Sequence, residues 1–189
     1  MYEAKNYEHL LGLDGFSDDL LTNHFGLYNG YVTNTNAALD EMKSLAPDSR
    51  SFAEISRRFG WEYNGMRLHE LYFGGMSKDG GTLAADGALG QKITEEFGSI
   101  DTWRENFLAK GAMRGIGWVI LCHDTEQDHL FNVWINEHDM GHLAGAQPLL
   151  VMDVFEHAFV LDYGVNRGAY IEAFMNAIDW KTVEDRFAH

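Results

Sequence analysis

Two long stretches of alternating apolar and polar residues open the chain, and their spacing predicts two helices. The first begins at Ser17, a residue typical of an N-cap that is followed by two aspartates, and continues to about Lys43. The second continues to about Phe73 and begins at Ser51, because Ser51 and Glu54 have the S-x-x-E spacing of a capping box. A proline separates the two stretches, so we expect an antiparallel helical hairpin.

The pattern changes after a glycine-rich segment, Gly74 to Gly90, which predicts a loop and a domain junction. Beyond it, short apolar runs typical of strands alternate with helical patterns. The expected helices are Lys92 to Phe97, Ile100 to Met113, Val154 to Tyr163 and Arg167 to Ile178. The expected strands are Trp118 to Cys122, Leu130 to Ile135 and Leu149 to Val154, the first two joined by the polar turn His123 to His129.

These elements predict an α+β fold. A helical hairpin domain, residues 1–85, would precede a domain of residues 86–189 with a small antiparallel sheet and surrounding helices.

Composition and charge then narrow the class of protein. The 189 residues carry 29 acidic and 14 basic side chains, a net charge of −15, which argues against nucleic acid or anionic lipid as a partner. No apolar run approaches the ~20 residues of a membrane span, and the first residues do not resemble a signal peptide, so we expect a cytoplasmic protein. The single cysteine, Cys122, lies in an apolar strand pattern and predicts a buried, inert thiol.

The sharpest candidate chemistry is the pair Asp153 and His157, where an apolar strand ends in two acids and a histidine. A carboxylate that enters the interior must be paired, ligated or neutralised. Both side chains could face one point and bind iron, manganese or zinc, or Asp153 could cap a helix while His157 packs in the core. His24 and His69, in the middle of the two long helices, could each be core residues or could add two imidazoles to the same point. Three histidines and one carboxylate with an open position would form a redox or hydrolytic metal centre.

At these residues the chain resembles the iron/manganese superoxide dismutases. The run from Asp153 to Ala158, DVFEHA, is close to that family's D-x-W-E-H-A signature, with Phe155 in place of the usual tryptophan. The resemblance covers nearly the whole chain in the right order. Its other stretches are Leu161 to Tyr163, Asn166-Arg167, Tyr170, Ala173-Phe174, Asn176, Trp180, Gly115 to Trp118, Leu68 to Phe73, His24 to Gly26 and Tyr31 to Asn34.

The resemblance implies conversion of superoxide into dioxygen and hydrogen peroxide at a mononuclear iron or manganese centre. Its ligands would be His24, His69, Asp153 and His157, with Trp118 as a wall of the site. It also implies a homodimer in which Glu156 reaches His157 of the other subunit.

Tyr31 resembles the family's active-site tyrosine but follows His24 by seven residues, where the family usually has eight. Seven residues return to nearly the same face of an α-helix, whereas eight are rotated by about 80°. We therefore expect a plain helix here and a bulged one in the usual relatives.

Two further departures concern the gate and the hydrogen bond to the metal's solvent. Tyr28 and Val160 replace a His–Tyr pair that the family uses between subunits. Gly65 stands where many iron-type relatives have glutamine, so His138 becomes the candidate for that hydrogen bond, with His142 and Glu137 as alternatives. Tyr31 and His138 would relay protons.

Two other interpretations stay open at this stage: a mononuclear iron protein with other oxygen or peroxide chemistry, and a non-catalytic relative. Dimer and tetramer also remain alternatives. For an anionic substrate, Arg67 and Arg167 are the cations that we expect to steer its approach in so acidic a protein.

Overall fold

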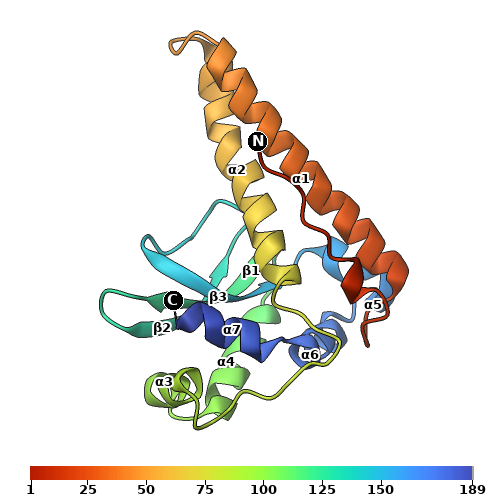
Figure 1. Ribbon diagram of the computed structural model, residues 1–189, viewed down its shortest axis with the longest axis vertical. Helices are drawn as coiled ribbons and strands as arrows, with labels where there is room; N and C mark the ends of the chain where they lie inside the picture. Colours follow the sequence, from red (N-terminus) through yellow and green to blue (C-terminus); the bar gives the residue numbers. More distant parts are fainter. Residues whose placement is uncertain (189) are drawn as a thin grey trace.

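The first half of the chain forms a long helical hairpin in the computed structural model, which describes residues 1–188. Helix α1 (Asp18–Ser44) and helix α2 (Arg50–Phe73) pack side by side and project from the rest of the molecule (Figure 1). The N-terminal segment, with a single 3-10 turn η1 (Glu8–Leu10), lies along α1. The predicted hairpin is therefore confirmed.

The two N-caps of the hairpin test the capping predictions. Ser17 caps α1 as predicted, and its Oγ accepts a hydrogen bond from the main-chain N–H of Leu20 at 3.0 Å. The prediction that Ser51 caps the second helix is wrong, because Ser49 does so and accepts from the N–H of Phe52 at 3.1 Å. Ser49 has the extended backbone, φ −80° and ψ 151°, that an N-cap needs, whereas Ser51 already lies within the helix.

Three antiparallel strands form the sheet in the order β2-β1-β3. They are β1 (Trp118–Asp124), β2 (His129–Ile135) and β3 (Ala146–Asp153). All three predicted strands are confirmed: β1 ends later than predicted, β2 begins earlier, and β3 both begins and ends earlier. The register pairs Trp118 with Asp153 at the end of the central strand, so the sheet delivers both side chains to the same edge.

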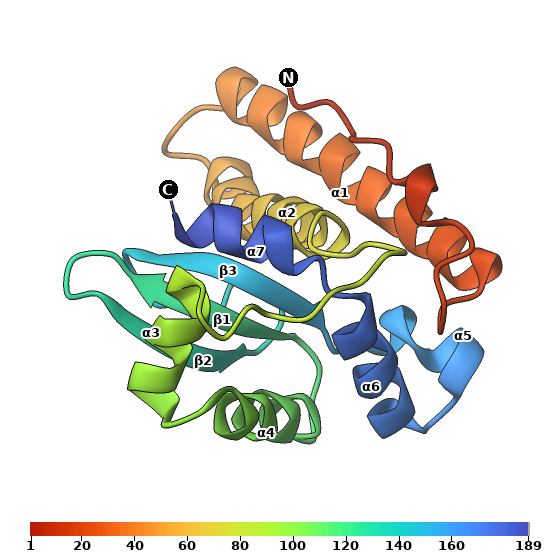
Figure 2. The same ribbon diagram turned by 60° about the horizontal axis from the view of Figure 1, so that its bottom comes forward.

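Helices cover the sheet on two sides. Helices α2 and α7 (Trp180–Phe187) pack against β3, whereas α3 (Ala88–Phe97) and α4 (Ile100–Gly111) pack against β2. Figure 2 shows the sheet between α7 above and α4 below. The α+β fold class is confirmed, and the division at residue 85 stays a prediction.

The segment after β3 differs most from the predicted elements. The predicted helix from Val154 to Tyr163 is wrong: a 3-10 turn, η2 (Glu156–Ala158), is followed by the four-residue α5 (Val160–Tyr163). The chain bends because the Asp153 carboxylate binds the main-chain N–H of Phe155, which keeps that residue extended. Helix α6 (Arg167–Ala177) follows as predicted, and α7 was not predicted.

No helix among residues 1–188 is long and apolar enough to cross a membrane.

Candidate metal centre

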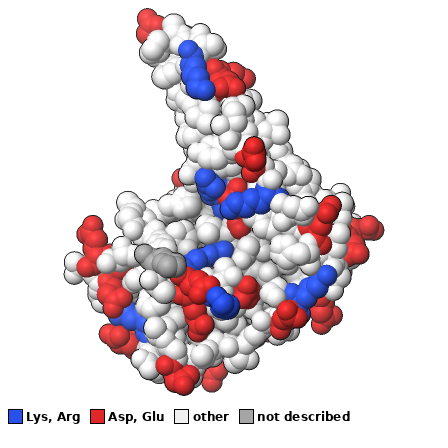
Figure 3. All heavy atoms as spheres, in the orientation of Figure 1, with Lys and Arg blue, Asp and Glu red and all other residues white. Residues whose placement is uncertain are grey.

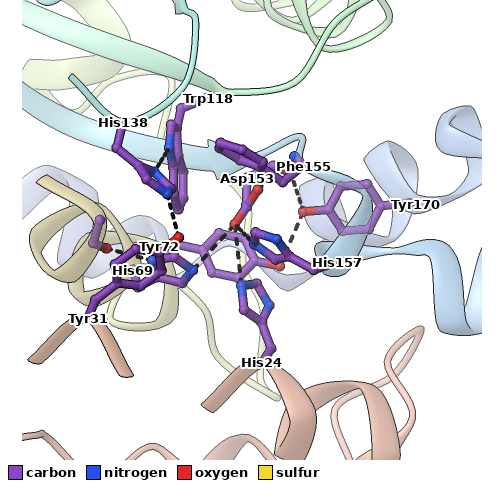
Figure 4. Close-up of polar contacts among 11 residues, drawn as sticks. His24, Tyr31, His69, Tyr72, Trp118, His138, Asp153, Phe155, His157 and Tyr170 are labelled. Carbon is purple, nitrogen blue, oxygen red and sulfur yellow. Dashed lines mark hydrogen bonds and ion pairs between the residues drawn. The ribbon is translucent and has the colours of Figure 1, made fainter. Parts of the chain in front are cut away.

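Four side chains from four different elements converge on one point. His24 comes from the middle of α1, His69 from α2, Asp153 from the last position of β3 and His157 from η2. Their ligand atoms all lie within 4.8 Å of one another, and Figure 4 shows the three imidazoles turned toward the carboxylate. The Oδ2 atom of Asp153 lies 3.3 Å from His24 Nε2, 3.7 Å from His69 Nε2 and 3.1 Å from His157 Nε2. The structure thus brings together all four ligands predicted from the sequence.

Two polar atoms of this cluster lack the hydrogen-bond partners that burial normally demands. His24 is 2% exposed and His69 and Asp153 are 0% exposed. The Nε2 atoms of His24 and His69 are buried and have no hydrogen-bond partner among the described residues. Buried polar atoms are satisfied in nearly all proteins, so two orphaned imidazole nitrogens beside a carboxylate fit a bound cation. Three nitrogen donors and one oxygen donor suit iron, manganese or zinc.

Contacts behind the cluster orient the donor atoms. His69 Nδ1 lies 2.6 Å from the main-chain oxygen of Gly65, one helical turn earlier, so Nδ1–H donates and Nε2 keeps its lone pair for a metal. The Oδ1 atom of Asp153 accepts from the N–H of Phe155 at 2.8 Å, which leaves Oδ2 facing the histidines. The hydroxyl of Tyr170 donates to the main-chain oxygen of Asp153 at 2.6 Å and fixes the end of β3.

The protonation states of the cluster match those of metal ligands. Burial lowers the pKa of His24, and it lowers the pKa of His69 well below the usual value, with the nearby charge of His24 as the next cause. Burial alone would raise the pKa of Asp153, but the charge of His157 and the hydrogen bond from His157, with the nearby His24 ring, hold it far below its usual range. His24 and His69, held neutral, and the ionised Asp153 are therefore in the forms that bind a metal ion.

Tyr31 enters the site from an uninterrupted α-helix, as its spacing from His24 predicts. Helix α1 is regular from Asp18 to Ser44, and the Tyr31 ring stacks on His69 with ring centroids 5.2 Å apart. Space for this ring depends on Gly65: a Cβ atom there would lie 2.6 Å from Tyr31 Cδ1 and 2.7 Å from its Cε1. The Tyr31 ring of the regular helix α1 therefore fits against α2 because residue 65 has no side chain.

His138, fully buried in the loop after β2, links Tyr31 to the sheet. Trp118 Nε1 lies 3.0 Å from His138 Nδ1, and an indole N–H can only donate, so Nδ1 is the acceptor. The proton of the neutral ring is then on Nε2, which donates to the Tyr31 oxygen at 2.7 Å. Burial lowers the pKa of His138 to about 4, so the ring is neutral near pH 7.

The two alternatives to His138, His142 and Glu137, make no hydrogen bond to Tyr31. His142 Nε2 binds the main-chain oxygen of His138 at 2.8 Å and does not contact Tyr31. Glu137 is in a left-handed backbone conformation, φ 60°, and acts on Tyr31 only through its charge. Of the three candidates, His138 is the one that makes a direct hydrogen bond to Tyr31.

Tyr28 does not form a gate in this chain. Its side chain is fully buried, and its hydroxyl donates to Glu70 at 3.1 Å and accepts from the main-chain N–H of Lys5 at 2.9 Å. Val160 is 49% exposed. Tyr28 therefore anchors the N-terminal segment to α2. Because both residues of the family's His–Tyr pair are replaced here, neither of them remains without its partner.

One residue of the site, Trp61, and the ring contacts of Phe155 were missed in the sequence. Trp61 on α2 has its ring centroid 4.6 Å from that of His138, edge to face. Trp61, Gly65 and His69 follow one another at four-residue steps along α2, and this i, i+4 ladder was the signal in the sequence. The stacking of Phe155 on His138 at 4.8 Å and on His157 at 5.1 Å required the tertiary structure.

Comparisons with known proteins match most of the chain. Residues 85–186 match the family model "Iron/manganese superoxide dismutases, C-terminal domain". The chain is 36% identical to superoxide dismutase [Mn] 2 of Haloferax volcanii over 174 residues, 90% of this chain and 86% of the relative. It is 37% identical to superoxide dismutase [Fe] of Cupriavidus metallidurans over 182 residues (93% and 90%), and 32% identical to superoxide dismutase [Fe] of Sulfolobus acidocaldarius over 178 residues (90% and 84%).

Proposed function

The chain belongs to the iron/manganese superoxide dismutase family, and on that premise we propose that it converts superoxide into dioxygen and hydrogen peroxide. The observation that carries the proposal is the cluster of His24, His69, Asp153 and His157, with two buried imidazole nitrogens that have no other described partner. These four residues would hold one iron or manganese ion per subunit. The bound ion would supply the one-electron redox chemistry that dismutation requires.

Tyr31, oriented by His138, would donate a proton that the reaction consumes. Two superoxide anions and two protons give one dioxygen and one hydrogen peroxide, so the site needs a proton source. Because His138 Nε2–H donates to the Tyr31 oxygen, the hydroxyl hydrogen of Tyr31 is free to be donated into the site. Burial raises the pKa of Tyr31 to about 12, which keeps this hydrogen in place near pH 7. Trp118, by donating to His138 Nδ1, fixes the direction of the whole chain of hydrogen bonds.

Iron and manganese are both proposed to support turnover. Relatives with either metal in their names align with most of this chain, and three nitrogens with one carboxylate suit both ions. The polar partner of Tyr31 comes from the loop after β2, His138, because Gly65 offers no side chain.

A homodimer in which Glu156 binds His157 of the second subunit is also proposed. Glu156 is exposed beside the partly exposed His157. It lines a cavity of about 520 Å³ together with Phe159, Val160 and Arg167. Apolar side chains gather around it: Val160 is 49% exposed, and the exposed neighbours in the chain include Leu161 at 57% and Val165 at 100%. Analytical ultracentrifugation of the protein and of Glu156→Ala tests this arrangement, which predicts a dimer that the substitution weakens.

The experiment that tests the function is separate reconstitution of the metal-free protein with iron and with manganese, followed by a superoxide dismutation assay. We expect turnover in proportion to bound metal, with about one ion per subunit. Full metal loading with negligible superoxide turnover would favour the alternative of other oxygen or peroxide chemistry. A protein that takes up neither ion would favour the non-catalytic alternative.

A further inference from the structure

A protein with a net charge of −15 must still admit a superoxide anion. Acidic side chains are spread over the face drawn in Figure 3. At physiological ionic strength the Debye length is about 8 Å, so the charges that matter are those close to the approach path. The question is which cation stands there.

The two arginines expected from the sequence contact none of the residues next to Tyr31 and His138. Arg67 binds Glu70 at 2.6 Å and stacks over Tyr2 and Tyr63. Arg167 donates to the main-chain oxygens of Met113 and Gly115 at 2.7 and 2.8 Å. Neither contact involves Tyr31 or His138.

Arg58 on α2 is connected to the site by a line of ring contacts. Its guanidinium carbon lies 5.1 Å from the centroid of the Trp61 ring, and the Trp61 ring lies 4.6 Å from that of His138. His138 in turn binds Tyr31 at 2.7 Å. The side chain of Arg58 is 56% exposed, Trp61 is half-buried and His138 is fully buried, so these side chains contact one another in series from the surface to Tyr31 beside the candidate ligands.

The Arg58 guanidinium is also held in one place. Its Nε donates to Glu62 Oε1 at 2.7 Å, while Asn34 donates to the other carboxylate oxygen at 3.3 Å. A planar guanidinium clamped between a carboxylate and an indole face is a fixed positive charge.

We propose that superoxide approaches the metal site from the side of Trp61 and that Arg58, stacked on Trp61, guides it there while offsetting the charge of the buried Glu62 carboxylate. The inference rests on the proposed function for its substrate. Without Arg58 the Glu62 carboxylate, 4% exposed, would lose its ion-pair partner and repel an incoming anion.

The test compares Arg58→Gln with Arg57→Gln in the metal-loaded protein. Arg57 is the matched control: it is the adjacent residue, carries the same charge, pairs with Glu54 and has a side chain that is 75% exposed. At low ionic strength we expect kcat/KM of Arg58→Gln to fall about threefold to tenfold and that of Arg57→Gln to change less than about twofold. The difference should vanish as salt approaches about 1 M, where the Debye length is about 3 Å.

A second readout does not depend on turnover. Azide, a small anion, is titrated into each metal-loaded variant, and its Kd is read from the absorption spectrum. Arg58→Gln should weaken azide binding by a similar factor at low salt, and Arg58→Gln with Glu62→Gln should recover most of the loss. Arg58→Lys, which keeps the charge, should retain most of the rate and affinity. Metal content and melting temperature, measured for every variant, identify any loss of folding.

Two results would overturn the inference. One is that Arg58→Gln matches Arg57→Gln in both kcat/KM and azide affinity at every salt concentration. The other is that Arg58→Lys is as impaired as Arg58→Gln, since a structural role of the stacked guanidinium would then explain the loss. If the loaded wild-type protein shows no dismutation, the proposed function fails while the azide titration still decides the role of Arg58.

Discussion

Gly65→Ala tests whether the position of the Tyr31 ring, which the regular helix α1 sets, depends on the absence of a side chain at residue 65 of α2. Ordinary carbon contacts are about 3.5–4.0 Å, yet the added Cβ would lie 2.6, 2.7 and 3.0 Å from three ring carbons of Tyr31. The ring must therefore move by about 1 Å, and the 2.7 Å hydrogen bond to His138 cannot survive that movement.

The magnitude follows from three contributions. Overpacking of a filled interior costs about 1–3 kcal/mol, and a buried hydrogen bond that loses its partner costs about 1–3 kcal/mol. Alanine in a helix interior returns about 1 kcal/mol relative to glycine. Gly65→Ala should therefore lower the free energy of unfolding by about 1–5 kcal/mol.

The assay is urea denaturation of metal-free protein, with Gly60→Ala as the matched control. Gly60 lies on the same helix and a Cβ there would meet no atom within 4 Å, so its substitution should stabilise the protein by about 1 kcal/mol. In a Tyr31→Ala background the penalty at Gly65 should disappear. If Gly65→Ala were as stabilising as Gly60→Ala, the packing argument for Tyr31 would be refuted.

Three further predictions concern the ligands, the thiol and pH. Asp153→Ala or His157→Ala should abolish metal retention and dismutation together, measured as metal per subunit and activity on the same samples; full activity in either would contradict the ligand assignment. Burial raises the pKa of the Cys122 thiol to about 12, from 9.0, so at pH 8 its thiolate fraction is about a thousandfold lower than that of a free thiol, and a thiol reagent should react with it only after unfolding. Because burial lowers the pKa of His24 and His69, the unfolded chain binds protons that the folded metal-free protein does not, and its stability should fall as pH drops below about 6.5, by up to about 1.4 kcal/mol per pH unit for each histidine. Urea midpoints from pH 8 to pH 5 measure this slope, which should become shallower in His24→Gln; a flat profile would mean that these histidines are not held neutral.

Three of the four proposed ligands, His24, His69 and Asp153, were predictable because regular elements fix their positions. His24 and His69 lie on long helices whose apolar pattern sets which face is buried. Asp153 ends a strand whose apolar run is legible in the sequence. Seven residues between His24 and Tyr31 place both on one face of a helix, so the plain helix could be inferred from spacing alone.

The rest of the site depends on contacts between distant segments. The predicted helix after Asp153 failed because a side-chain hydrogen bond to Phe155 holds the backbone extended, and helix periodicity carries no trace of such a bond. The tautomer of His138 depends on Trp118, which is 20 residues away in the chain. The space for Tyr31 depends on Gly65, which lies on the other helix of the hairpin. Apolar patterns predict elements, whereas these contacts depend on how the elements pack.

The central claim is that His24, His69, Asp153 and His157 hold one redox-active ion. Its most direct test is anomalous diffraction at the iron and manganese absorption edges from crystals of the protein loaded with each metal. We predict one peak per subunit within bonding distance of the Nε2 atoms of the three histidines and of Asp153 Oδ2. A peak elsewhere, or none in a protein that dismutates superoxide, would contradict it.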